Sequence, residues 1–475
     1  MNPPKKEEHK DPTANNGSVN GMPITSTFGK TKTKKVFIET YGCQMNLADS
    51  ETMGGLLAED GYQSAESMED ADIILINTCA VREKAEERVF GRLTHLQPLK
   101  KKNPDLVLGI TGCMAEHLRE KIAERAPDVD IIVGPDAYRR LPDLLGDKSS
   151  GKNMDALIDV KLDKAETYEG IPVKRRPGIT SHISVQRGCD KFCTFCIVPF
   201  TRGRERGVSP EEVLKQAHQS VALGFKELML LGQTVNSYTH HDENGKLTDF
   251  SDLLNMLVEI EGIERIRFTS PYPTDFNAKL IATMASHKKI CKYLHLPAQS
   301  GSNRMLGLMR RQYTREEFDT LVGDIRTAMP NIAMSTDIIV GYPGESEDDF
   351  EATVDLLKTT RFDFGYLFKY SERSQTFAAR NVEDDIPEAL KKARLKKIIE
   401  VQEAICGEVF PAMIGQTVEV LVERDSKRNA RQWVGKTDGF KACVFDKKDN
   451  GVGPGSLVKV LVKNATSHTL IGEQI

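Results

Sequence analysis

One stretch near the middle of the chain reads Arg187-Gly188-Cys189-Asp190-Lys191-Phe192-Cys193-Thr194-Phe195-Cys196. It places three thiols within eight residues, and the next cysteine is Cys291. A structural zinc site uses four ligands, and a ferredoxin-type run supplies a fourth cysteine followed by proline. Neither pattern follows, and the nearest histidine, His182, is expected inside the preceding strand. The spacing predicts an iron–sulfur cluster with one iron left open, and structural zinc is the alternative.

The composition of the whole chain limits the class of protein. Its 475 residues fit about three domains, and 39% hydrophobic residues are enough to build their cores. A formal net charge of -4 gives no overall nucleic-acid signature, so any basic surface must be local. Nine cysteines spread over a long chain favour reduced thiols over a secreted disulfide framework. Because the chain has no apolar run of about eighteen residues and no signal-like N-terminus, we expect a soluble, cytoplasmic protein without a membrane segment.

Shifts in composition divide the chain into five segments. The first is polar and basic, which is typical of a disordered tail, and contact with a polyanion is its alternative reading. Alternating apolar runs and helical patterns then predict an α/β fold class with parallel strands, interrupted by one polar linker. We expect a tail over residues 1–35, an N-terminal α/β domain over 36–147 and a linker over 148–177. A partial (β/α)6 barrel with its C-terminal helix follows over 178–410, and a small β-barrel over 411–475.

Three predicted strands of the first domain each end at a cysteine, and these are Cys43, Cys79 and Cys113. A helical pattern follows each of them. In a parallel α/β sheet the carboxyl ends of neighbouring strands lie side by side, and a helix N-terminus favours the thiolate form of cysteine. Free cysteine is also a common core residue, so chance packing is the alternative. Three equivalent positions favour a second site with three thiolates.

The central segment repeats strand, turn and amphipathic helix six times. We predict its strands over residues 182–187, 227–232, 265–269, 292–296, 334–340 and 364–370. Six such units indicate a curved, partly closed parallel barrel, shorter than the barrel with eight units. Barrel enzymes keep their chemistry at the carboxyl ends of the strands, and the central cysteine stretch follows the first strand.

Polar groups lie at the ends of several of these strands. An ordinary turn is the alternative reading for each glycine, but together the groups predict a rim that binds a nucleoside and an amino-acid moiety. His295 is either a ligand contact or a hydrogen-bonded structural residue, and Cys291 is expected in the core. The candidate cofactor contacts are Gln233, Ser270, Gln299, Asp337 and Gly341.

The C-terminal segment changes from a helical period to a period of two. One long amphipathic helix is expected over 387–410, and the strands over 417–422 and 457–462 predict a small antiparallel barrel. Basic groups interleaved with aromatic residues between them suit phosphate contact and base stacking. A solvated hairpin with a core tryptophan is the alternative. The candidate RNA contacts are Arg428, Arg431, Trp433 and Lys436, with Phe440 among the same bases.

The spacing Cys189-x-x-x-Cys193-x-x-Cys196, with Phe195 before the last cysteine, resembles the radical S-adenosylmethionine enzymes. The strand-end cysteines and a C-terminal segment that looks like a TRAM RNA-binding domain narrow the resemblance to the methylthiotransferases. It covers nearly everything after Lys35. Within that family, the branch acting on isopentenylated adenosine in tRNA is similar at Tyr41-Gly42-Cys43-Gln44-Met45-Asn46, Asn77-Thr78-Cys79-Ala80-Val81-Arg82-Glu83-Lys84-Ala85 and Pro199-Phe200-Thr201-Arg202-Gly203.

Two positions depart from the pattern of the family. Ser374-Gln375 stands where the family usually shows Pro-Gly. Leu231-Gly232-Gln233 replaces the Gly-Gly-Glu of the wider superfamily, as is common in this branch. The second departure leaves the individual cofactor contacts at that strand end open.

The resemblance implies a tRNA methylthiotransferase that adds a methylthio group to C2 of N6-isopentenyladenosine beside the anticodon. The cysteines of the central stretch would hold a [4Fe-4S] cluster that binds S-adenosylmethionine and cleaves it reductively. Cys43, Cys79 and Cys113 would hold a second [4Fe-4S] cluster that carries the methylthio sulfur. The C-terminal barrel would hold the anticodon stem-loop of tRNA. An electron donor such as flavodoxin or ferredoxin and a monomeric state are also expected.

Two other functions stay open at this point. Within the family, the alternative is methylthiolation of threonylcarbamoyl-adenosine in tRNA or of a ribosomal-protein aspartate. Outside it, the alternative is a non-enzymatic iron–sulfur protein that binds RNA or carries electrons, which would not consume S-adenosylmethionine.

Overall fold

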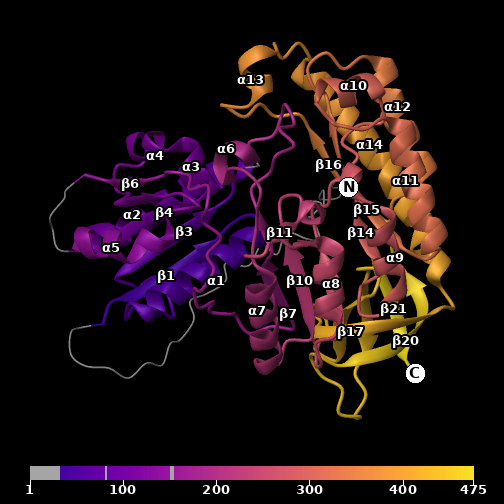
Figure 1. The fold of residues 1–475 in the computed structure, drawn as a ribbon, viewed down its shortest axis with the longest axis horizontal. Helices are drawn as coiled ribbons and strands as arrows, with labels where there is room; N and C mark the ends of the chain where they lie inside the picture. The colour runs from indigo at the N-terminus through magenta and orange to yellow at the C-terminus, as the bar shows by residue number, and fades with distance from the viewer. Residues whose placement is uncertain (1–32, 81–82, 150–154) are drawn as a thin grey trace, which may run out of the picture.

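The computed structural model describes residues 33–80, 83–149 and 155–475. Figure 1 shows an N-terminal α/β body beside a central body of strands and helices, with the yellow C-terminal barrel packed against the lower part of the central body. The predicted tail lies outside the described residues as far as residue 32, and so do residues 150–154 of the predicted linker. Within the described part of the chain, no helix is long and apolar enough to cross a membrane.

The N-terminal body is built on a six-stranded sheet in the order β2-β1-β3-β4-β5-β6, and every neighbouring pair is parallel. Strands β3 and β4 are buried along their whole lengths, as expected for a parallel sheet covered on both faces. Part of the segment expected to be a linker forms a strand, β6, at the edge of this sheet. The strands are β1 Lys35–Thr40, β2 Gln63–Ser64, β3 Ile73–Thr78, β4 Val107–Gly112, β5 Ile131–Val133 and β6 Leu157–Asp159.

Helices cover both faces of this sheet. Helices α1 and α5 pack on one face, and α2 and α4 pack on the other. The helical pattern expected after Cys113 is divided between two short helices, α3 and α4. The chain breaks at Arg119, whose φ of 50° is incompatible with a continuous right-handed helix. The helices are α1 Gln44–Glu59, α2 Glu83–Lys102, α3 Cys113–Leu118, α4 Glu120–Arg125 and α5 Leu141–Ser149.

The central body contains the six predicted strands as two parallel sheets, β13-β10-β7 and β14-β15-β16. A parallel bridge between Ile266 and Ile290 links the two sheets, so the strands follow one another around a partial barrel. The first predicted strand is split, because β8 leaves β7 and pairs antiparallel with β9. The strands are β7 Thr180–Ser184, β8 Gln186–Arg187, β9 Arg206–Gly207, β10 Glu227–Leu231, β11 Thr239–His241, β12 Leu247–Asp249, β13 Arg265–Phe268, β14 Tyr293–His295, β15 Ala333–Val340 and β16 Phe364–Lys369.

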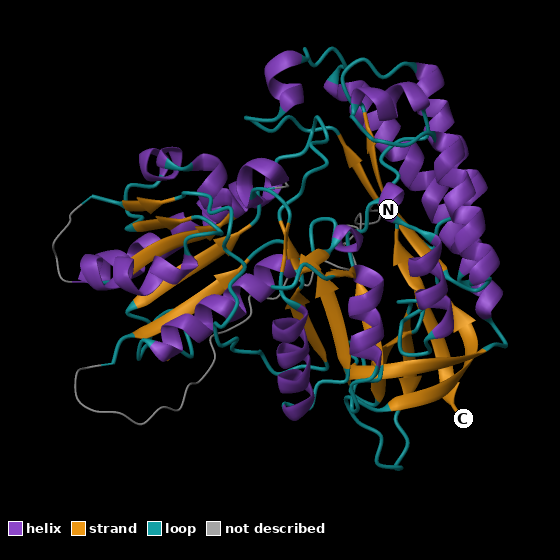
Figure 2. Ribbon diagram, in the orientation of Figure 1, coloured by secondary structure: helices purple, strands orange, loops and turns teal. Residues whose placement is uncertain are grey.

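Helices surround this partial barrel on its outer side, and Figure 2 shows them in purple around the orange strands. Their starts are encoded locally, because Ser, Thr, Asp or Asn side chains cap the backbone at the N-termini of α7 to α12. The predicted long helix is present as α14. The helices are α6 Val198–Arg202, α7 Pro210–Ala222, α8 Phe250–Val258, α9 Ala278–Ser286, α10 Asn303–Leu308, α11 Arg315–Ala328, α12 Glu347–Thr360, α13 Phe377–Asn381 and α14 Glu388–Val409.

The C-terminal strands close into a barrel in the order β17-β18-β19-β21-β20. Four neighbouring pairs are antiparallel, as expected, whereas β19 and β21 run parallel. The strands are β17 Thr417–Asp425, β18 Gln432–Thr437, β19 Ala442–Asp446, β20 Leu457–Ala465 and β21 Thr469–Gln474.

The turn between β18 and β19, residues 438–441, packs against the partial barrel. Phe440 stacks on Tyr293 of β14, with ring centroids 4.8 Å apart. It also packs with the cluster that contains Met45 of α1 and Met229 of β10. The expectation that Phe440 lies on an RNA-binding surface is therefore wrong, because the turn points inward. This aromatic side chain instead joins all three bodies.

Arg267 of β13 anchors the same turn. Its three guanidinium nitrogens donate to the carbonyl oxygens of Thr437 and Asp438 and to the carboxylate of Glu227, each at 2.7 Å. Arg267 is almost fully buried. The backbone oxygens of the turn have a buried cationic partner, so the barrel is docked on the central body by charge-assisted hydrogen bonds.

We predict that Arg267→Met lowers the free energy of unfolding by about 3 kcal/mol, because it leaves the Glu227 carboxylate buried without its partner. Urea denaturation followed by the fluorescence of Trp433, the only tryptophan in the chain, measures the change. Arg424→Met is the matched control, since Arg424 is exposed on β17. Equal stabilities of the two variants would contradict the anchoring role of Arg267.

Candidate iron–sulfur and cofactor sites

Three strand ends bring Cys43, Cys79 and Cys113 together at one edge of the first sheet. Their strands, β1, β3 and β4, are neighbours, and Cys43 is the N-cap of α1 while Cys113 opens α3. Cys79 and Cys113 are buried, and Cys43 is exposed. A hydrogen bond with Cys79, helped by the positive charge of Arg202, lowers the pKa of the Cys43 thiol to about 6. We call these three residues the strand-end triad.

Glycine allows the strand ends to approach one another. Gly42 has a φ of 121°, and a Cβ atom at this position would lie 2.5 Å from the Cβ of Cys79. Any side chain would therefore push the loop that carries Cys43 away from Cys79. Gly42 is therefore needed to bring the thiol of Cys43 close to that of Cys79.

The central stretch forms a compact loop that we call the loop triad, for Cys189, Cys193 and Cys196. The amide of Cys189 donates to the carbonyl of Gly203 at 3.1 Å, and the amide of Cys196 donates to the carbonyl of Cys193 at 3.0 Å. Burial raises the pKa of Cys189 to about 11 and that of Cys196 to about 12, and the nearby Cys193 thiol raises both. The three thiols therefore lie close together, and binding to iron would displace their protons.

Arg311 contacts the loop triad from the other half of the partial barrel. One terminal nitrogen donates to the sulfur of Cys193 at 3.2 Å, and the other donates to the carbonyl oxygen of Pro297. The guanidinium carbon lies 4.4 Å from the ring centre of Tyr272. A cationic donor is thus held against one of the predicted ligand sulfurs.

Neither triad has the geometry of a site for one ion. Among the described residues, no three His, Cys, Asp or Glu side chains converge as ligands of a single metal ion. The thiolates of a four-iron cluster bind separate irons and need not converge on one point.

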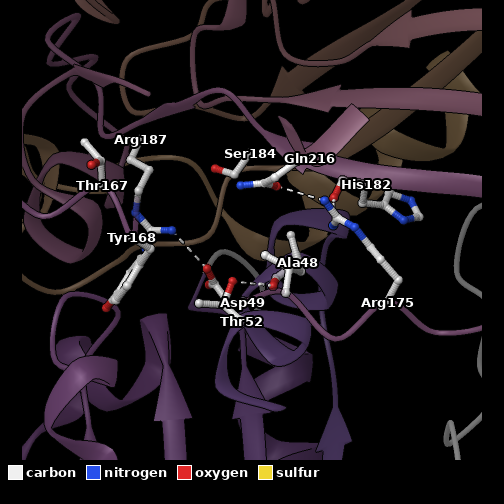
Figure 3. Close-up of a pocket in the computed structure, with 11 residues that line it drawn as sticks. Ala48, Asp49, Thr52, Thr167, Tyr168, Arg175, His182, Ser184, Arg187 and Gln216 are labelled. Atoms are coloured by element: carbon white, nitrogen blue, oxygen red, sulfur yellow. Dashed lines mark hydrogen bonds and ion pairs between the residues drawn. The ribbon is translucent and has the colours of Figure 1, made fainter. Parts of the chain in front are cut away.

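A buried network of charges connects the segments that carry the two triads. Asp49 of α1 accepts from Arg187 at 3.1 Å, and its second oxygen lies 2.6 Å from Arg202. Figure 3 shows Arg187 directed toward Asp49, beside the ring of Tyr168. Arg187 precedes the loop triad and Arg202 follows it, so one carboxylate holds both sides of this loop against α1.

Two candidate cofactor contacts have unusual backbone geometry. Ser270, after β13, has a φ of 59°, and Gln299, after β14, has a φ of 69°. Such values are uncommon outside glycine and concentrate at functional sites. The side-chain oxygen of Gln299 is buried, and no hydrogen-bond partner reaches it from the described residues. This oxygen can accept an N–H group of a bound ligand.

The other candidate cofactor contacts lie on the same side of the sheet. The backbone amide of Gln233, after β10, donates to the side chain of Gln186 at 2.9 Å. Asp337 of β15 is 3.3 Å from His295, which also contacts Ser335 at 2.9 Å, so His295 is hydrogen-bonded within the protein. Gly341 follows β15, and a Cβ atom there would lie 2.5 Å from the side chain of Lys391. Its φ of 70° also favours glycine, and its contact with the cofactor stays a prediction.

The candidate RNA contacts separate into two groups. Arg428 and Arg431 are exposed in the loop between β17 and β18. Trp433 is half-buried against the barrel core, with the ammonium of Lys447 4.0 Å from its ring centre. Lys436 lies 3.4 Å from the ring centre of Phe440, and burial lowers its pKa. The arginines face solvent, whereas Lys436 belongs to the docked side of the barrel.

Reasoning from the sequence missed the two arginines at the sulfurs. Arg202 donates to the sulfur of Cys113 at 3.0 Å, and Arg311 donates to that of Cys193. Arg202 lies in the quoted motif after the loop triad, but nothing in that motif indicates contact with the first domain. For Arg311 no local pattern signals the contact.

Comparison with known families matches three parts of the chain. Residues 35–134 match the family described as Uncharacterized protein family UPF0004, residues 183–357 match the Radical SAM superfamily, and residues 411–475 match the TRAM domain. Among solved structures, the radical S-adenosylmethionine methyltransferase TsrM from Kitasatospora setae, with cobalamin and a [4Fe-4S] cluster bound, has a TM-score of 0.55 at 14% identity. The alignment covers 73% of this chain and 77% of that one, and the likeness concerns the fold.

Two curated relatives are similar over almost their whole lengths, and both are named tRNA-2-methylthio-N(6)-dimethylallyladenosine synthase. The protein from Christiangramia forsetii is 42% identical over 458 residues, which are 93% of this chain and 94% of the relative. The protein from Pelodictyon phaeoclathratiforme is 46% identical over 439 residues, which are 92% of this chain and 98% of the relative. The chain therefore belongs to the tRNA-2-methylthio-N(6)-dimethylallyladenosine synthase family of the radical S-adenosylmethionine superfamily.

Proposed function

We propose that this protein is a tRNA methylthiotransferase that adds a methylthio group to C2 of N6-isopentenyladenosine next to the anticodon. The observation that carries the proposal is the pairing of two separate cysteine triads, one at the edge of the first sheet and one in the loop after β8. Relatives named for this activity match 93% and 92% of the chain. The proposed functional units are residues 36–147, 178–410 and 411–475.

The reaction needs chemistry that side chains do not provide. The C2–H bond of adenine is neither acidic nor open to ordinary nucleophiles, so acid–base residues are insufficient. When bound, two [4Fe-4S] clusters and S-adenosylmethionine supply the electron, the radical and the methylthio sulfur. The protein binds and orients these groups. In the proposal, the loop triad holds one cluster and the strand-end triad holds the other.

The residues around both triads suit these groups. Three thiolates leave one iron of a four-iron cluster open, and a small organic molecule can bind there. The unpartnered oxygen of Gln299 can accept an N–H of S-adenosylmethionine at the same strand ends. Gln233, Ser270, Asp337 and Gly341 are the remaining candidates for contacts with the cofactor.

The substrate assigned to the C-terminal barrel is the anticodon stem-loop. Exposed Arg428 and Arg431 suit phosphate contacts, and Trp433 offers part of an aromatic face for a base. Lys436 is a weaker candidate because its ammonium lies over Phe440. The proposal also includes a flavodoxin or ferredoxin as electron donor, a monomeric enzyme, and the cytoplasm as the place where tRNA is modified.

Mass spectrometry of tRNA nucleosides from a strain lacking this gene tests the proposed substrate. We expect N6-isopentenyladenosine to accumulate without its 2-methylthio group, and the modification to return with the gene. Loss of the methylthio group from threonylcarbamoyl-adenosine, or from a ribosomal-protein aspartate, would instead identify the alternative substrate. An unchanged set of nucleosides and proteins would contradict a methylthiotransferase.

For the loop triad, we predict that Cys189→Ala, Cys193→Ala or Cys196→Ala abolishes formation of 5′-deoxyadenosine from S-adenosylmethionine under reducing conditions. The reason is that each change removes a ligand of the cluster that binds the cofactor, while about half of the iron remains on the strand-end triad. Chromatography of the nucleoside product measures the loss. Cys291→Ala, at a buried cysteine outside both triads, is the matched control. Normal cleavage in the loop variants would refute their role.

For the strand-end triad, Cys43→Ala, Cys79→Ala and Cys113→Ala should still form 5′-deoxyadenosine but yield no methylthio product on tRNA. The expected separation arises because the cofactor and the sulfur are held at different sites. Both products are measured from the same reaction mixture, with Cys406→Ala as the control. Methylthio product from any of the three variants would exclude the sulfur-carrying role.

For the barrel, the double variant Arg428→Ala/Arg431→Ala should raise the KM for tRNA about tenfold and leave kcat nearly unchanged, because two phosphate contacts are lost. The slope of log affinity against log salt should fall by about 2. Lys459→Ala, an exposed lysine on β20, serves as the control. An equal effect of the control would place the tRNA elsewhere.

A further inference from the structure

Arg202 is a residue of the central body that completes the surroundings of the strand-end triad. It is the last residue of α6, and it is buried. Its Nε donates to the sulfur of Cys113 at 3.0 Å. Cys113 otherwise packs with Ala80, Ile197 and Phe200, so the contact lies in apolar surroundings where charge is poorly screened.

The remaining nitrogens of Arg202 have unequal partners. One terminal nitrogen, Nη2, forms an ion pair with the carboxylate of Asp49 at 2.6 Å, and the other, Nη1, has no such partner. Both are buried, and neither donates a hydrogen bond to any of the described residues. A buried guanidinium nitrogen without an acceptor is costly, and the inorganic sulfides of a cluster on the neighbouring cysteines would provide acceptors. The arginine is thus better suited to the cluster-bound form than to the thiols alone.

The buried charge of Arg202 should affect the reduction potential of the cluster more than the charge of a surface arginine does. A reduced cluster is more negative than an oxidised one, so a nearby cation and hydrogen bonds to sulfur stabilise the reduced form. Asp49 offsets part of this effect, because it is an anion close to the same guanidinium. Arg204, two residues further on, instead pairs with Asp190 at the surface.

We propose that Arg202 is a positioning residue of the strand-end cluster, which orients the Cys113 sulfur and raises the reduction potential of that cluster. The inference rests on the proposed function, because it assumes a cluster on the strand-end triad. It assigns to the central body a direct part in a site whose ligands all come from the N-terminal body. The packing of the two bodies against each other then sets the reduction potential of the cluster as well as its position.

The test uses the full chain with Cys189→Ala, Cys193→Ala and Cys196→Ala, so that only the strand-end triad can hold a cluster. After anaerobic reconstitution with iron and sulfide, the midpoint potential is measured by a redox titration monitored by electron paramagnetic resonance. Adding Arg202→Gln to this triple variant should lower the midpoint potential of the cluster. The expected change is tenfold or more in the redox equilibrium constant, which is about 59 mV for one electron. Arg202→Lys should lower it less, since the charge remains while the Nε donor is lost.

Two further substitutions make the result decisive. Asp49→Asn should shift the potential in the opposite direction, because it removes the opposing anion and keeps a side chain of the same size. Arg204→Gln is the matched control, with the same change of charge in the same segment, and should leave the potential unchanged. Equal potentials for Arg202→Gln and Arg204→Gln would overturn the proposal. If the Arg202→Gln variant takes up no cluster, the Asp49→Asn variant decides the matter. A midpoint potential in Asp49→Asn that does not rise would then overturn the proposal.

The same experiment separates this inference from the proposed function. If the triple variant binds no iron at all, the assignment of a cluster to the strand-end triad is wrong and the inference falls with it. If the cluster is present and its potential is insensitive to Arg202 and Asp49, the proposed function stands and the role of Arg202 alone is rejected.

Discussion

The arrangement of both cysteine triads depends on one buried carboxylate, that of Asp49. It lies between Arg187 and Arg202, and all three side chains are buried. Removing one member of such a group leaves an uncompensated buried charge, which makes any other placement of the two bodies unfavourable. Because the two arginines flank the loop triad, and Asp49 belongs to the helix capped by Cys43, this contact links the positions of the two sites.

The C-terminal barrel also fixes the relative position of the N-terminal and central bodies. The turn between β18 and β19 is anchored by Arg267, and its Phe440 packs in a cluster with Met45 of α1 and Met229 of β10. Met45 lies two residues after Cys43. The barrel is therefore a structural part of the catalytic body as well as the candidate surface for RNA. Its loop with Arg428 and Arg431 is exposed on the described surface.

The sequence predicted the parts of the fold that depend on local patterns. Short apolar runs predicted the strands of the partial barrel and β17 and β20 of the C-terminal barrel, whereas β18, β19 and β21 were not predicted individually. The position of a cysteine directly after β1, β3 and β4 was sufficient to predict a group of thiols, because parallel strands end at a common edge. The contacts made by Arg202, Arg311 and Phe440 were not predictable. Each joins segments that are far apart along the chain, and no periodicity records which distant partner a buried arginine or aromatic ring meets.

Several backbone conformations also could not be predicted from the sequence. The break at Arg119 and the left-handed conformations of Ser270 and Gln299 are not favoured by the residues themselves, so no local pattern predicts them. Gln375, where the family usually has glycine, also has a positive φ of 76°, and its side chain donates to the carbonyl of His117 in α3. The departure from the family pattern thus adds a contact between the two bodies near Cys113.

The central claim is that one chain holds two clusters on two separate triads. Iron and acid-labile sulfide content, together with Mössbauer spectra of the anaerobically reconstituted protein, test it most directly. The account predicts about eight irons per chain in the unaltered protein and about four when either triad is replaced by alanine, with the spectrum of a [4Fe-4S] cluster in each case. About four irons in the unaltered protein, or complete loss of iron when the loop triad alone is replaced, would contradict it.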